Sequence, residues 1–124
     1  MKTLLIVGAV LMALGVMLGA FGAHGLKGRL TPEMMAVYQT AVTYHMWHGL
    51  GVLILAMLSL HFPASQHLIT AGWLMLAGIL LFSGSLYAVS LTGIKVLGAI
   101  TPLGGLAFIA AWLLGAWSLL RASA

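Results

Sequence analysis

The chain has 124 residues, of which 63% are hydrophobic and only 5% are charged, with five Lys and Arg residues against one acidic residue. A soluble domain carries about 25% charged residues, so this composition excludes a water-facing globular surface, a disordered chain and a nucleic-acid-binding domain. The chain has no cysteine, which also excludes disulfides, thiolate metal sites and cysteine nucleophiles. These features predict a small polytopic membrane protein.

Four apolar runs, each of about 20 residues or more, predict an all-α integral membrane bundle of four transmembrane helices. They form a single domain, residues 1–124, with helices expected at about 4–23, 32–60, 69–91 and 102–120. Lys2 and the small residues that close the first run resemble a signal peptide. The run is longer than an ordinary signal core, so we expect it to remain as the first helix.

A Thr-Pro pair marks the start of the second predicted helix. Thr31 supplies an N-cap hydroxyl, Pro32 suits the first helical position, and Glu33 lies near the positive end of the helix dipole. Thr101 and Pro102 predict the same kind of start for the fourth helix. The second helix would be roughly 43 Å long, which exceeds the ~30 Å hydrocarbon core, so its first turns are expected in the interface.

Small residues form one stripe on the first predicted helix and one on the fourth. In lipid, small residues allow helix backbones to approach closely. Such stripes join helices of one chain or join separate chains, and so small a bundle has few interior positions for so many glycines. We therefore expect a homo-oligomer. The predicted helix-packing residues are Gly8, Gly15, Gly19, Gly22, Gly104, Ala107, Ala111 and Gly115.

Polar side chains gather toward one half of the predicted bundle. Imidazole and phenol groups share one face of the second helix, and hydroxyl groups share one face of the third. Ionisable residues inside a membrane usually face the bundle interior or a cavity. We therefore predict a shallow polar cup that opens toward the first and third connections and in which the imidazoles meet the third-helix hydroxyls. Its residues are His24, Tyr38, Tyr44, His45, His48, Ser83, Tyr87, Ser90 and Lys95.

Three roles remain open for these groups. They tether the helices to headgroups and neighbouring backbones without a ligand, or they form a cup that binds a lipid headgroup, quinone or small solute or relays protons, since histidine titrates near physiological pH. A metal role would fall to His24, His45 and His48, because three nitrogen ligands plus water is a known zinc arrangement. No Asp or Cys is present to complete that set, so we expect neither a metal nor a cofactor.

Enzyme activity is not expected. General acid–base catalysis normally uses a histidine with a carboxylate that orients it. The single carboxylate, Glu33, lies near a turn, where we expect it to pair with Lys27 or Arg29. The glycines lie inside apolar helices, so they form no phosphate-cradling loop.

Four segments together resemble a known family. They are residues 19–27 (GAFGAHGLK), 38–49 (YQTAVTYHMWHG), 82–87 (FSGSLY) and 100–105 (ITPLGG). In this order they resemble the YgdD-like bacterial inner-membrane proteins, the domain-of-unknown-function 423 family, which is related to the animal transmembrane protein 256 group. The resemblance covers essentially the whole chain. It implies a small multi-pass protein of the bacterial plasma (inner) membrane, and it carries no catalytic residue with it.

Two functional hypotheses follow. The first is a non-enzymatic, oligomeric membrane component that binds lipid or organises partners. The alternative is a proton-linked carrier or pore for a small solute, which would use the polar cup and its histidines. The expected partners are the lipid bilayer, further copies of the chain, and a lipid or small-molecule ligand, but no nucleic acid.

Overall fold

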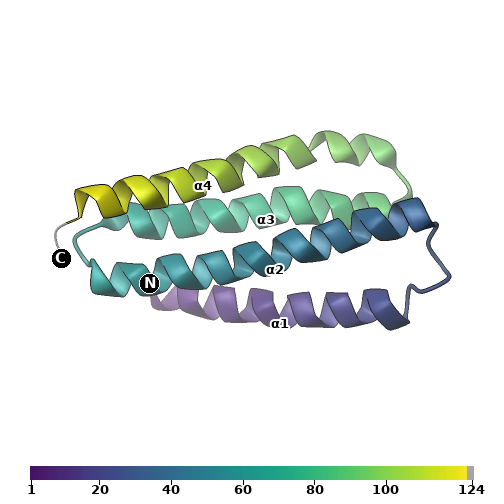
Figure 1. The fold of residues 1–124 in the computed structure, drawn as a ribbon, viewed down its shortest axis with the longest axis horizontal. Coiled ribbons are helices and arrows are strands. Elements are labelled where there is room, and N and C mark those ends of the chain that lie inside the picture. Colours follow the sequence, from purple (N-terminus) through teal and green to yellow (C-terminus); the bar gives the residue numbers. More distant parts are fainter. Residues whose placement is uncertain (123–124) are drawn as a thin grey trace.

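The computed structural model describes residues 1–122, which form five helical segments. They are α1 (Lys2–His24), α2 (Pro32–His61), α3 (Gln66–Thr92), the short 3₁₀ helix η1 (Lys95–Ala99) and α4 (Thr101–Arg121). The four α-helices run side by side along the long axis of the molecule (Figure 1). Within these residues, four helices are long and apolar enough to cross a membrane. The all-α, four-helix prediction is confirmed.

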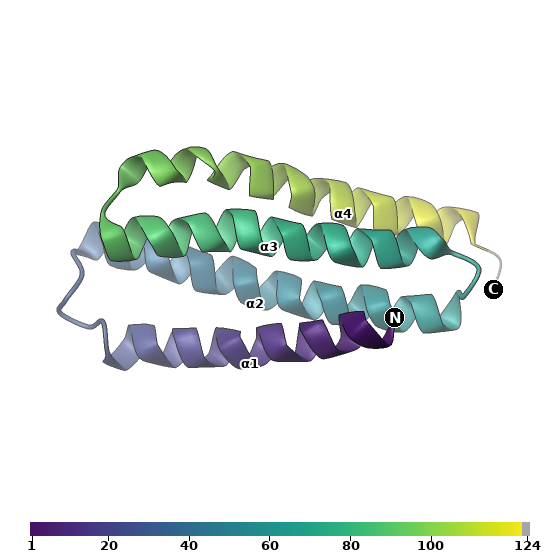
Figure 2. The same ribbon diagram turned by 180° about the vertical axis from the view of Figure 1, so that it is seen from behind.

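Each long helix packs mainly against the next one in the sequence, so the four helices form an open arrangement rather than a closed ring. α2 packs between α1 and α3, and α3 packs between α2 and α4. α1 barely contacts α3, and both views place α1 and α4 at opposite edges of the molecule (Figures 1 and 2). α1 therefore has a single long neighbour, α2.

The interior divides into an apolar half and a polar half. The buried apolar side chains gather nearer the α2–α3 turn and include Leu4, Val52, Leu68 and Met75. Most buried polar side chains, including His45, Ser83 and Ser90, lie toward the other end, on α2 and α3, whereas Ser59 and Ser118 lie near the α2–α3 turn. Large apolar side chains such as Leu80, Leu113 and Leu120 point outward, as expected of a surface that faces lipid.

The small-residue stripes pack inside one chain. A Cβ atom added at Gly104 would lie less than 3.0 Å from backbone atoms of Phe82, so α4 and α3 touch backbone to backbone. Glycines of α1 are also packed closely, but against side chains of α2. Gly22, for example, lies against the ring of Tyr38. Of the eight predicted packing residues, Gly19 and Ala107 are half-buried and the others are buried. An interface between chains therefore needs residues in addition to these stripes.

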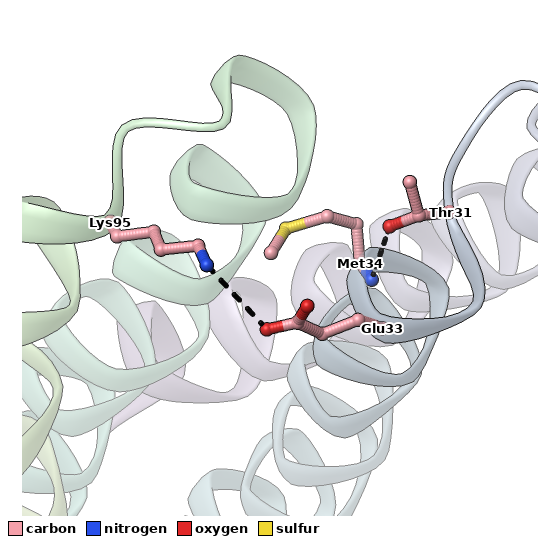
Figure 3. A network of polar contacts seen from close by, with 4 residues as sticks. All are labelled: Thr31, Glu33, Met34 and Lys95. Carbon is pink, nitrogen blue, oxygen red and sulfur yellow. Dashed lines mark hydrogen bonds and ion pairs between the residues drawn. The ribbon is translucent and has the colours of Figure 1, made fainter.

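The two Thr-Pro pairs behave differently. The Thr31 hydroxyl accepts a hydrogen bond from the Met34 backbone N–H at 3.2 Å (Figure 3), which is the predicted cap of α2. For α4, Pro102 lies in the first turn as predicted, but the predicted Thr101 cap is wrong: no side chain of the described residues caps α4, and the Thr101 hydroxyl instead bonds to Ser85 of α3. The physical reason is that Ile100 is already helical and continues the turn of η1 into α4.

The single acidic side chain has a different partner from the expected one. Glu33 pairs with Lys95 of η1, with 3.8 Å between Oε1 and Nζ (Figure 3). The expectation of a pair with Lys27 or Arg29 is wrong, because η1 brings Lys95 over the start of α2. Both side chains are largely exposed, so the pair contributes about 0–1 kcal/mol.

Candidate functional site

His45 joins three helices through its two ring nitrogens. From its place on α2, Nε2 lies 2.7 Å from the Leu11 carbonyl oxygen of α1, and Nδ1 lies 2.9 Å from the Tyr87 hydroxyl of α3. A carbonyl only accepts hydrogen bonds, so Nε2 carries the ring proton and donates it. In the neutral form of the ring Nδ1 is then the acceptor, and the Tyr87 hydroxyl donates to it. The imidazole is 4% exposed.

Two further hydroxyls extend this arrangement. Tyr38, which is 1% exposed, donates from its hydroxyl to the Leu18 carbonyl of α1. Its ring lies beside that of Tyr87, with 5.5 Å between centroids. Ser83 of α3 donates to the Ala41 carbonyl of α2 at 2.8 Å. We call Tyr38, His45, Ser83 and Tyr87 the polar layer, because together they bond α1, α2 and α3 to one another.

His48 lies apart from the polar layer. Its Nδ1 donates to the Tyr44 carbonyl one turn earlier, at 2.8 Å. Its ring stacks on Phe108 of α4, with 3.6 Å between centroids and 13° between planes. Tyr44 packs its own ring against Phe82 of α3. The two residues therefore form an aromatic contact between α2, α3 and α4.

The remaining predicted cup residues do not join the layer. His24 and Lys95 are exposed, and Lys95 pairs with Glu33. Ser90 is buried but bonds to the Tyr87 carbonyl of its own helix. The three imidazoles do not converge as expected, and only His45 contacts a hydroxyl of α3. The buried polar side chains of this half of the bundle bond mainly to backbone carbonyls, and His45 and Tyr87 also bond to each other.

Metal binding finds no support in this geometry. Within residues 1–122, no group of three His, Cys, Asp or Glu side chains is placed to hold a metal ion. Both nitrogens of His45 already have partners within the protein. A ligand role for this ring would break its bonds to α1 and α3.

Sequence reasoning missed two hollows, of which one borders the polar layer at Tyr38 and the other lies far from it. A groove of about 330 Å³ runs between α1 and α2, beside Gly19, Gly22 and Ala23. A larger cavity of about 500 Å³ lies at the opposite end of the bundle, between the α2–α3 turn and the end of α4. Its polar groups come from segments that are about 50 residues apart in the chain, so no local pattern marks it.

Comparison with known proteins gives a consistent result. Residues 18–105 match the family model described as "Protein of unknown function (DUF423)". The chain is 53% identical over 114 residues to the UPF0382 membrane protein YwdK of Bacillus subtilis, covering 92% of this chain and 93% of that protein. It is 50% identical to a UPF0382 membrane protein of Staphylococcus haemolyticus, covering 92% of each chain. No solved structure matches the chain.

Proposed function

Because the chain belongs to the DUF423 family of membrane proteins, for which no activity is described, we propose a function from its own geometry: a non-enzymatic, homo-oligomeric component of the bacterial plasma membrane that organises partners in the bilayer. The observation that carries this proposal is the free edge of α1. This helix has one long neighbour, α2, and the opposite side of α1 is exposed. In a bilayer, that side meets lipid or another helix.

The exposed side of α1 has the composition of a helix–helix interface. Ala9, Ala13 and Ala20 are all exposed and lie within about 40° of one another at 100° per residue. Small residues at such spacing let a second helix approach closely in lipid. These alanines differ from the glycine stripe of the same helix, which is already packed against α2.

The groove between α1 and α2 continues this surface. It is lined on α1 by Gly19, Gly22 and Ala23, and the same helix carries the exposed, bulky Met17 and Phe21. In an isologous, two-fold interface, the same surface of each chain meets the other chain. The bulky side chains of one α1 can then fill the groove beside α1 of the second copy. We therefore take a second copy of this chain as the partner.

The test is the oligomeric state of matched variants in mild detergent, measured by native mass spectrometry. Ala13→Leu places a bulky side chain in the stripe and is expected to give monomer. Ala116→Leu makes the same change on the exposed side of α4 and is expected to leave the oligomer intact. A monomeric wild-type protein, or an Ala13→Leu variant that keeps its oligomer, would contradict the proposal.

A second candidate, the proton-linked carrier, is favoured by the contact between His45 and Tyr87. This pair places two titratable groups in direct hydrogen-bond contact inside the bundle. The two functions differ in proteoliposomes that contain a pH-sensitive dye. A carrier gives proton flux that is lost in His45→Gln, whereas the oligomeric component gives the flux of protein-free vesicles.

A further inference from the structure

The α2–α3 connection and the last turns of α4 lie at the same end of the bundle (Figure 1). The residues that line the larger cavity come from these segments. It has a volume of about 500 Å³. Its polar lining comes from the α2–α3 connection with the first turn of α3, and from the last turns of α4. These lining residues are His61, Ser65, His67, Ser118 and Arg121, with Trp117 between them.

The aromatic ring of Trp117 is held by two basic side chains. The Arg121 guanidinium lies over the indole at 5.4 Å from its centroid, a cation–π contact. The His67 ring meets the same indole edge-on, at 5.1 Å between centroids. The cavity wall therefore presents a guanidinium and an imidazole from two different helices.

The charge around this cavity is unbalanced. Its polar side chains are cationic, imidazole or hydroxyl groups. The only acidic residue of the sequence, Glu33, is engaged with Lys95 at the opposite end of the molecule. An anion in the cavity would meet the Arg121 guanidinium without competition from an acidic side chain.

One buried hydroxyl of the cavity lining lacks a partner. Ser118 is 2% exposed, and its Oγ makes no hydrogen bond with any of the described residues. A buried hydroxyl without a partner costs about 1–3 kcal/mol, so such groups normally have one. Ser118 lines the cavity, and a hydrogen-bonding ligand there would supply the partner that residues 1–122 do not.

We propose that this cavity binds a phosphate group, as carried by an anionic phospholipid headgroup or by free phosphate. Guanidinium groups bind phosphate through two parallel hydrogen bonds, and imidazole and serine groups add further donors. Tryptophan and arginine near the end of a membrane span belong at the headgroup level, where phospholipid phosphates lie. The site goes beyond the proposed oligomer, since none of its residues lies on α1.

The test compares Arg121→Gln with Arg29→Gln in the full-length, delipidated protein. Arg29 is exposed near the opposite end, so both variants lose one positive charge and only one loses the site. Native mass spectrometry measures the occupancy of phosphatidylglycerol, with zwitterionic phosphatidylcholine as the reference lipid. We expect Arg121→Gln to weaken phosphatidylglycerol binding about ten-fold, Ser118→Ala to weaken it to a smaller extent, and Arg29→Gln to leave it unchanged.

A second arm identifies the source of the phosphate. Isothermal titration with inorganic phosphate gives heat that is lost in Arg121→Gln if the free ion is sufficient, and no heat if the site requires a lipid headgroup. Either result, together with selective binding of phosphatidylglycerol, supports the site. Equal binding of the two lipids, or equal effects of Arg121→Gln and Arg29→Gln, would overturn it.

Discussion

His45 and Tyr87 are 42 residues apart in the sequence and share one hydrogen bond, with 2.9 Å between Nδ1 and the phenol oxygen. The other ring nitrogen, Nε2, donates a hydrogen bond to a third group, the Leu11 carbonyl of α1. A single imidazole thereby sets the positions of α1 and α3 relative to α2.

This contact predicts a measurable coupling between the two residues. His45→Phe leaves the Tyr87 hydroxyl without its acceptor, and we expect it to lower the free energy of unfolding by about 1–2 kcal/mol. Reversible unfolding by dodecyl sulfate in mixed micelles provides the measurement. In a double-mutant cycle with Tyr87→Phe, the two effects should be less than additive. Strict additivity would show that the bond contributes nothing, and His24→Phe, an exposed change, serves as the control.

The closest approach of α3 and α4 predicts opposite outcomes for two adjacent glycines. In Gly104→Ala the new Cβ meets backbone atoms of Phe82, which move only if the helices separate. We therefore expect the free energy of unfolding to fall by about 1–3 kcal/mol. In Gly105→Ala the nearest atoms, from the Phe82 ring, lie 3.8 Å away. We expect Gly105→Ala to leave the free energy of unfolding unchanged or to raise it by up to about 1 kcal/mol, because alanine has a higher helix propensity than glycine. Equal effects in the same unfolding assay would refute the backbone contact.

The cap of α2 predicts a local effect on amide exchange. Thr31→Ala removes the oxygen that accepts from the Met34 N–H, and we expect faster hydrogen–deuterium exchange in the first turn of α2 and a loss of about 1 kcal/mol. Thr31→Ser keeps the oxygen and should exchange as the wild type does. If serine and alanine behave alike, the hydroxyl is not the cap.

The exposed ion pair between Glu33 and Lys95 predicts almost no effect on stability. Both side chains are largely in solvent, where such a pair is screened by salt. Glu33→Gln should change the unfolding free energy by less than about 1 kcal/mol, and the difference should vanish at high salt. A larger loss that persists in salt would mean that this carboxylate has another role.

The helices were predictable from sequence because their signal is local. Each apolar run is continuous, and the cap at Thr31 depends on residues within one turn. The 3₁₀ helix η1 is not predictable from the sequence. Its residues Val96 and Leu97, together with Lys95 and Gly98, have the composition of an apolar connection between two helices. The predicted Thr101 cap of α4 is wrong for the same reason, because the geometry at this helix start depends on the helical turn that precedes it.

The polar residues illustrate a second limit. A three-residue step turns a helix by about 300°, so His45 and His48 lie about 60° apart and appear to share a face. Yet α2 is an inner helix with neighbours on several sides, and this offset is enough to direct His45 toward α1 and α3 and His48 toward Phe108 of α4. Which neighbour occupies which side depends on the whole arrangement, and no spacing within α2 encodes it.

The helices differ in length, so they do not all extend equally far across the bilayer. α2 has 30 residues and α1 has 23, or about 45 Å against 35 Å. At the start of α2 the Glu33–Lys95 pair joins this helix to η1, and both side chains are largely exposed. Charged side chains are costly inside the bilayer, so this pair belongs in the aqueous layer. A water-soluble, amine-reactive reagent should therefore modify Lys95 only from the side of the membrane on which α2 begins.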